Sequence, residues 1–267
     1  MVSTFNARDA DVYERSMGRW SRRLAPGLID FAELGEARAV LDVGCGPGSL
    51  LFTLAENPAL TDITGIDASP IYTQAARARS TDSRITILDG DACAMPFEAA
   101  SFHAALSQLV LQFVPDPLAA VREMRRVVKP GGTVAAAVWN SFGGMPHQRL
   151  FWDTAAMLDP KAGDLRAATF SRTTTVKGDL PRIFAEAGLS GIVESSATIW
   201  MDFENFQDFW GPIEGGEGTL GKYATSLAPE LAERLKLHCR DGYEAGRPDG
   251  PRHFACTAFL CRGKVPA

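Results

Sequence analysis

The sequence has few of the residues from which metal sites and disulfide frameworks are built. It holds five cysteines and four histidines in 267 residues, and no two cysteines form a C-x-x-C pair. His238, Cys239, His253, Cys256 and Cys261 lie close in sequence, but their spacing matches no standard zinc pattern. We therefore expect reduced thiols, no bound metal and a cytoplasmic location.

Long apolar runs and an excess of positive charge are also missing. No apolar run approaches the ~18 residues that span a membrane, and the polar first residues, MVSTFNARDADVYERS, differ from a signal peptide. Lysine and arginine number 27 against 32 acids, a net charge of −5. Nucleic-acid partners usually need a basic face, so we expect neither a nucleic-acid partner nor a membrane span. The oligomeric state is not readable from the sequence.

One stretch predicts a strand, a glycine turn and a helix in succession. Ala39–Val43 forms an apolar strand, residues 44–48 read GCGPG, and residues 49–55 form an apolar helix. Glycines allow a sharp turn and a close approach by a ligand, and the following helix presents free N–H groups. A dinucleotide turn reads G-x-G-x-x-G, whereas this turn is one residue shorter. The stretch therefore predicts a crevice for a smaller nucleotide-like ligand.

Strands and helices alternate regularly on either side of this turn. Near-continuous apolar strands of this kind are typical of a parallel sheet with both faces covered. Asp67 ends the second strand, where an acid can accept hydrogen bonds from ribose hydroxyls. The strands are expected at 39–43, 62–67, 85–88, 102–106, 133–139, 191–201 and 254–261. The helices are expected at 9–31 with a break at Pro26-Gly27, and at 49–55, 70–80, 117–128, 147–158, 180–186, 203–210 and 223–239. Residues 159–177 and 211–221 are expected to be flexible.

Four motifs in order resemble the class I S-adenosylmethionine-dependent methyltransferases, and in pattern their ubiquinone/menaquinone-biosynthesis-like small-molecule group. The motifs are VLDVGCGPG, the GID that ends at Asp67, Asp91-Ala92 followed by MPF, and VVKPGG. They cover Val40 to Trp139. One departure is Ser101-Phe102-His103, where the related pattern has SFD, but this position starts a strand, away from its functional end.

The resemblance implies a Rossmann-like, doubly wound α/β fold. Its seven-stranded mixed sheet would have helices on both faces, an antiparallel last strand and helical lid insertions. Residues 1–267 would form a single methyltransferase domain. Within it, residues 1–36 would be an N-terminal helical cover, 37–139 the cofactor-binding core, and 140–178 and 202–251 the substrate or lid insertions.

The resemblance also implies S-adenosylmethionine as cofactor, S-adenosylhomocysteine as product, and a role for each matching residue. The glycine turn would follow the methionine and sugar parts of the cofactor, and Asp67 would bind the ribose. Ala68 would pack on the adenine, and Asp91 would accept from its amino group. The cofactor-binding residues are expected to be Tyr13, Arg19, Trp20, Gly44, Cys45, Gly46, Gly48, Asp67, Ala68, Asp91, Ala92, Ser107 and Gln108.

The implied reaction transfers a methyl group to a small-molecule acceptor, apolar or aromatic, by O- or C-methylation rather than N-methylation. Ser107-Gln108-Leu109-Val110 lacks the Pro-Pro-aromatic element of enzymes that methylate nucleic-acid amino groups. His147 is the candidate base or substrate contact, because it follows the fifth strand, where substrate loops gather. Trp139, Trp210, Glu214 and Tyr223 are candidate substrate contacts. The alternative is a non-catalytic cofactor-binding module that regulates or scaffolds a partner.

Overall fold

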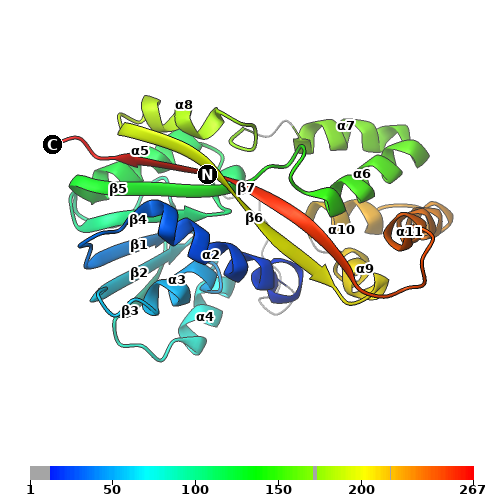
Figure 1. Cartoon of the computed structure of the whole chain (residues 1–267), viewed down its shortest axis with the longest axis horizontal. Coiled ribbons are helices and arrows are strands. Elements are labelled where there is room, and N and C mark those ends of the chain that lie inside the picture. The colour runs from blue at the N-terminus through cyan, green and yellow to red at the C-terminus, as the bar shows by residue number, and fades with distance from the viewer. Residues whose placement is uncertain (1–12, 171–172, 217) are drawn as a thin grey trace. The chain divides into compact units, whose positions relative to one another are not determined.

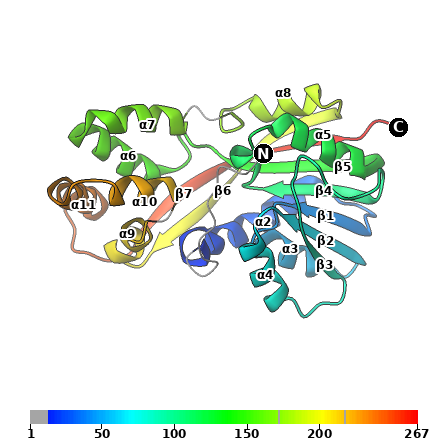
Figure 2. The ribbon, with the colours of Figure 1, turned by 180° about the vertical axis from the view of Figure 1, so that it is seen from behind.

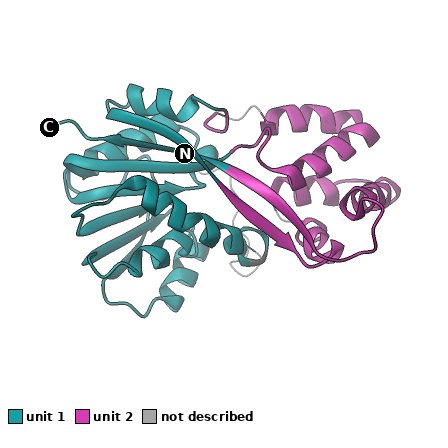
Figure 3. Cartoon of the chain, in the orientation of Figure 1, with its two compact units in different colours: residues 1–139, 177–197, 258–267 teal, residues 140–176, 198–257 magenta. Residues whose placement is uncertain are grey.

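The computed structural model describes residues 13–170, 173–216 and 218–267. The chain divides into two compact units (Figure 3). Unit 1 comprises Met1–Trp139, Lys177–Ala197 and Ala258–Ala267, and unit 2 comprises Asn140–Val176 and Thr198–Thr257. Among the described residues, no helix is both long enough and apolar enough to cross a membrane.

A seven-stranded sheet runs in the order β3-β2-β1-β4-β5-β7-β6 (Figure 1). The strands are β1 (Ala39–Val43), β2 (Asp62–Asp67), β3 (Ile85–Asp89), β4 (Phe102–Gln108), β5 (Val128–Trp139), β6 (Ser190–Phe203) and β7 (Arg252–Lys264). The pairs from β3 to β5 are parallel, whereas β7 pairs with β5 in the antiparallel sense, with Trp139 opposite Ala258. The predicted seven-stranded mixed sheet with an antiparallel last strand is therefore confirmed.

The helices of unit 1 pack on the sheet (Figure 2). They are the π-helical turn η1 (Glu14–Gly18), α2 (Arg19–Ala32), α3 (Ser49–Ala55), α4 (Pro70–Arg79), the 3₁₀ turn η2 (Leu111–Phe113), α5 (Pro117–Val127) and α8 (Asp179–Glu186). α5 begins where the Asp116 side chain accepts a hydrogen bond from the Ala119 N–H, with Pro117 at the first turn. Its Val121 and Met124 are fully buried in the core that includes residues of β1, β4, β5 and α8.

The first helical region differs from the sequence prediction. α2 runs without a break through Pro26, because a proline removes only one backbone donor and the apolar stripe of Trp20, Leu24 and Leu28 remains buried on either side of it. The part of the predicted helix before Tyr13 lies outside the described residues.

Unit 2 holds five helices among its described residues. They are α6 (Pro146–Leu158), α7 (Pro160–Phe170), α9 (Phe206–Glu214), α10 (Gly218–Thr225) and α11 (Pro229–Glu244). The expectation of flexible passages at 159–177 and 211–221 is wrong for much of their length, because α7 and α10 lie there and α9 extends to Glu214. The Asp159 side chain accepts from the Lys161 N–H at 3.0 Å at the start of α7, and buried Tyr223 anchors α10.

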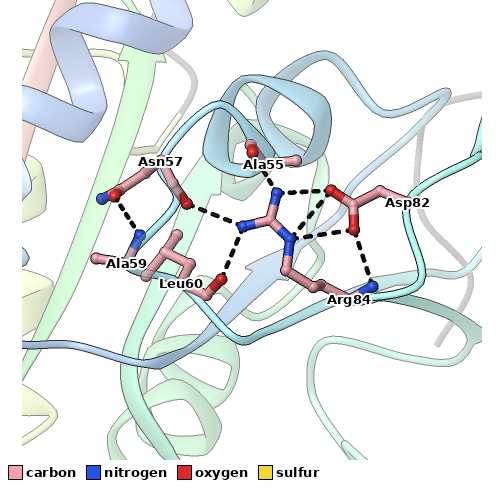
Figure 4. A network of polar contacts seen from close by, with 6 residues as sticks. All are labelled: Ala55, Asn57, Ala59, Leu60, Asp82 and Arg84. Carbon is pink, nitrogen blue, oxygen red and sulfur yellow. Dashed lines mark hydrogen bonds and ion pairs between the residues drawn. The ribbon is translucent and has the colours of Figure 1, made fainter.

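A network around Arg84 fixes the connection from α3 to β2 (Figure 4). Its guanidinium donates to the carbonyl oxygens of Ala55, Asn57 and Leu60 at 2.5, 3.0 and 2.8 Å, and it pairs with Asp82. The carbonyls at the end of a helix lack intrahelical partners, so one arginine satisfies several groups together. The network holds the start of β2, the strand whose other end carries Asp67.

Candidate functional site

The glycine turn is bonded to the neighbouring strand. The N–H groups of Gly44 and Cys45 donate to the Ile66 carbonyl of β2 at 2.7 and 3.0 Å. Gly44 and Gly46 have φ values of +76° and +53°, which side chains disfavour. A methyl group on Gly44 would collide with Val110, whereas one on Gly46 would meet no atom within 4 Å. The backbone at Gly46 therefore faces open space.

Asp67 closes the other side of this turn. Its Oδ2 accepts from the Gly46 N–H at 2.9 Å and its Oδ1 from the Ser69 N–H at 2.8 Å. Burial raises the pKa of the Asp67 carboxyl, while the two backbone bonds act in the opposite direction. The neighbouring Ala68 is exposed. An acid and an open backbone edge thus meet at the carboxyl ends of β1 and β2.

Asp42 is a second acid at this edge, and the sequence interpretation missed it. It is only 1% exposed in β1, and neither carboxylate oxygen has a hydrogen-bond partner at normal geometry among the described residues. Burial and the charge of Asp67 raise its pKa well above the usual range, and the Leu51 N–H offsets this only in part. An acid within an otherwise apolar strand, VLDV, was the signal that could have identified it.

The predicted N-terminal cover lies beside these acids. The Tyr13 hydroxyl is 3.5 Å from the Ser21 Oγ, and its ring centroid is 5.1 Å from that of Tyr72. Burial raises the pKa of Tyr13 to about 12, and the charges of Asp67 and Asp42 add to the effect. The Arg19 guanidinium lies 4.2 Å from the ring centroid of Trp20.

The ends of β4 and β5 carry buried polar groups. Gln108 Nε2 donates to the Ser21 carbonyl at 2.9 Å and ties β4 to α2. The Ser107 hydroxyl, the Gln108 side-chain oxygen and the Trp139 indole N–H have no hydrogen-bond partner among the described residues. After β3, Asp91 Oδ1 accepts from the Cys93 N–H at 2.8 Å, which shapes the loop that contains Ala92. The predicted residues of unit 1, from the turn to these strand ends, thus lie along one edge of the sheet.

The remaining candidates lie in unit 2. The Tyr223 hydroxyl donates to Asp159 Oδ2 at 2.9 Å, and this bond and burial raise its pKa. Tyr223 and Trp210 both contact the Phe151 ring, with centroids 6.1 and 6.2 Å away. Glu214 instead pairs with Lys236 at 2.7 Å on the surface. The structure therefore places Trp210 and Tyr223 in one aromatic cluster and Glu214 outside its ring contacts.

His147 is buried in unit 2 near the start of α6. Its Nδ1 lies 3.6 Å from Cys256 Sγ, and its ring is 6.0 Å from the Phe203 ring. Burial lowers the pKa of His147 to about 4 and raises that of Cys256 to about 12, so both are neutral at pH 7. They form a neutral pair rather than a thiolate–imidazolium pair. No group of three or more His, Cys, Asp or Glu able to hold a metal ion occurs among the described residues.

The sequence was compared with protein families and with known proteins. The family profile described as a methyltransferase domain matches residues 41–136, the segment from β1 to β5. An uncharacterized 37.1 kDa protein in transposon Tn4556 of Streptomyces fradiae is 36% identical over 171 residues, which cover 61% of this chain and 46% of that protein. Demethylmenaquinone methyltransferase of Bacillus licheniformis is 29% identical over 163 residues, which cover 57% of this chain and 70% of that protein. Residues 41–136 thus match a methyltransferase domain, and the relatives support a class I S-adenosylmethionine-dependent methyltransferase.

The solved structures show the same methyltransferase fold. Phosphoethanolamine N-methyltransferase 2 of Haemonchus contortus, solved with S-adenosylhomocysteine, has a TM-score of 0.60 and 16% identity, and the match covers 97% of this chain and 57% of that one. The chain spans under half the length of the first curated relatives it matches, 44–46% of each.

The residues present fit the methyltransferase cofactor. S-adenosylmethionine brings ribose hydroxyls, which donate hydrogen bonds, and positively charged sulfonium and ammonium groups. The edge offers the carboxylate of Asp67, the unpartnered buried carboxylate of Asp42 and the open backbone at Gly46. A cationic ligand would lower the raised pKa values of both acids, because it favours their charged form.

Proposed function

We propose that the protein transfers a methyl group from S-adenosylmethionine to a small-molecule acceptor. The observation that carries the proposal is the arrangement of buried Asp42 and half-buried Asp67 around an open glycine turn. When bound, the cofactor supplies an activated methyl group, so the protein needs chiefly to bind, orient and exclude water.

The proposed cofactor contacts are those that the sequence resemblance implies, with Asp42 added from the structure. Asp67 would accept from the ribose hydroxyls, and Asp42 would face the positively charged amino acid part. The loop with Asp91 and Ala92 would hold the adenine beside exposed Ala68. Tyr13, Arg19 and Trp20 of the N-terminal segment would cover the cofactor, and the unpartnered Ser107 hydroxyl and Gln108 oxygen would lie near its methionine part.

We further propose that the acceptor is apolar or aromatic and receives the methyl group on oxygen or carbon. The aromatic cluster of unit 2 supports this, because rings provide most of the contact area in sites for such molecules. The name of the demethylmenaquinone relative also supports it. His147, Trp139, Trp210, Glu214 and Tyr223 remain the predicted acceptor contacts, and His147 would act as a neutral contact because of its low pKa.

Turnover with a panel of acceptors tests the proposal. The protein is incubated with radiolabelled S-adenosylmethionine and, separately, phenols, quinols, isoprenoids, carboxylic acids and amines, and transfer of label to the acceptor is measured. We expect transfer to a phenol, a quinol or an isoprenoid, and much slower transfer by Asp67→Asn at the same cofactor concentration. Transfer only to amines would refute the proposed acceptor class. Tight cofactor binding without transfer to any class would favour the non-catalytic module.

A further inference from the structure

Glu14 joins the described start of the chain, Tyr13 to Gly18 and here called the N-terminal segment, to the helices α2 and α4 of unit 1. Its carboxylate pairs with Arg22 of α2 and lies 3.7 Å from Arg79 Nη1 of α4. The same carboxylate lies against Gly18, where any side chain would collide with it. Glu14 begins η1, a π-helical turn, and such turns are frequent at functional sites.

Arg79 carries this link to the glycine turn. Its Nη1 donates to the Pro47 carbonyl at 3.3 Å, and its guanidinium lies 5.3 Å from the ring centroid of Phe52 in α3. A second link is formed by Ser49, whose hydroxyl donates to the Gly18 carbonyl at 3.5 Å. The N-terminal segment is thus linked at two points, Pro47 and Ser49, to the carboxyl-terminal end of the glycine turn.

The residue before Glu14 shows what the segment covers. Tyr13 is half-buried, and the charges of Asp67, Glu14 and Asp42 all act on its hydroxyl. A ligand beside Asp42 and Asp67 would therefore lie next to Tyr13, in the segment that Glu14 holds. The side chains of Glu14, Arg22 and Arg79 are 29%, 44% and 46% exposed. Ion pairs of this kind are individually weak and are screened by salt, which suits a link that opens repeatedly.

We propose that Glu14 is a positioning residue whose ion pairs with Arg22 and Arg79 hold the N-terminal segment over the glycine turn and set how long the cofactor stays bound. The proposal rests on the proposed function, because it assumes that S-adenosylmethionine binds at the turn. Glu14 acts through the segment that carries Tyr13 and has no role in the transfer itself.

Dissociation kinetics test this proposal. Radiolabelled S-adenosylmethionine is bound to the full chain and chased with unlabelled cofactor. Glu14→Gln should release the label roughly 3- to 10-fold faster, the range expected from losing one or two partly exposed ion pairs. Salt should accelerate release from the wild type more than from this variant. Arg79→Met should have a similar effect, and the double variant should be less than additive, since both changes remove the same contact.

Matched variants separate positioning from folding. Glu186→Gln makes the same change of charge and breaks an exposed ion pair with Arg182 on α8, and we expect it to release label at the wild-type rate. Should Glu14→Gln unfold, Ser49→Ala removes the second link alone and should also speed release. Wild-type release rates from Glu14→Gln and Arg79→Met at low and high salt would overturn the positioning role. Failure of the wild type to bind the cofactor would overturn the proposed function and this inference with it.

Discussion

The Asp67 carboxylate and the Gly46 N–H are joined by a hydrogen bond of 2.9 Å. This bond links the end of β2 to the middle of the turn that follows β1, two segments that are separated by α3 in the chain. Gly46 has no side chain and open space beside it, so the same carboxylate is placed where a ligand lies against the backbone. The acid therefore shapes the turn, and it is the group that we propose as the ribose contact.

Asp67→Asn should weaken binding of S-adenosylhomocysteine by about 10- to 100-fold. Hydrogen bonds to a charged group contribute about 1.5–3 kcal/mol, and an amide oxygen is a weaker acceptor with only one oxygen to offer. Isothermal titration calorimetry measures the change directly. The matched control is Asp62→Asn, at the exposed start of the same strand, which should bind like the wild type. Equal affinities for Asp67→Asn and Asp62→Asn would show that the ribose contact is misplaced.

Asp42→Asn should stabilise the free protein and impair cofactor binding. Burial raises the pKa of Asp42, so the folded state holds its proton more tightly than the unfolded chain. The contribution of protonated Asp42 to the free energy of unfolding is fully present below the unfolded pKa of about 3.9. It is lost as the pH rises toward the raised folded pKa. Removing the charge should therefore raise the melting temperature at pH 7 by about 2–4 °C, the shift that roughly 1 kcal/mol produces in a domain of this size.

The pH dependence distinguishes this effect from a general gain in stability. The difference in melting temperature between Asp42→Asn and the wild type should shrink as the pH falls toward 4, because the wild-type carboxyl becomes neutral there. Cofactor affinity should fall in the same variant, since the ammonium group loses its counter-charge, as in other trade-offs between stability and activity. A variant that is less stable at pH 7 and binds normally would contradict the assignment.

Much of the fold was readable because each signal was local. Turn glycines and apolar strands separated by amphipathic helices predict the order of the first five strands. The structure has the first four within two residues of the predicted bounds, whereas β5 begins at Val128, five residues before the predicted start at 133. The helices α7 and α10 were missed because their apolar contacts come from distant segments: Tyr223 packs on Trp152, 71 residues earlier in the chain. Composition describes a glycine-rich segment as flexible, whereas tertiary packing decides whether it is helical.

The sequence predicted the acid at the end of a strand, Asp67, but not the acid inside a strand, Asp42. Asp67 follows an apolar run and precedes Ser69-Pro70, a helix start, so its position at the sheet edge follows from the sequence. Asp42 reads as one polar residue in an apolar strand, and only its burial beside Asp67 shows its importance. His103 likewise needed the structure: its Nδ1 accepts from the Ala39 N–H at 3.1 Å and ties the starts of β1 and β4 together.

Gly46→Ala should block cofactor binding with only a modest loss of stability. The residue has φ of +53°, so alanine would be strained by roughly 1 kcal/mol. Its new methyl group would stand in the open space beside Asp67, where the cofactor must approach. Gly131→Ala is the matched control, because Gly131 has φ of +78° and also meets no atom within 4 Å. Both variants should lose similar stability in urea, and only Gly46→Ala should lose affinity for S-adenosylhomocysteine.

His147→Gln should make the free energy of unfolding depend less on pH between pH 6.5 and 4. Burial lowers the pKa of His147 from 6.5 to about 4, so the unfolded chain binds this proton more tightly than the folded one. The stability that neutral His147 provides is complete above pH 6.5 and is lost as the pH falls toward 4, by about 2–4 kcal/mol in total. The variant should therefore lose less stability than the wild type between pH 6.5 and 4, as measured by urea unfolding at each pH.

His238→Gln provides the control for this comparison and for the predicted acceptor contact. His238 lies on α11 of the same unit with a 42% exposed side chain, so His238→Gln makes the same substitution outside the buried surroundings of His147. If His147 contacts the acceptor, His147→Gln should also raise the KM for the acceptor while S-adenosylhomocysteine binds as before. If the pH dependence of stability weakens while the KM stays unchanged, His147 has a structural role in the core of unit 2 and does not contact the acceptor.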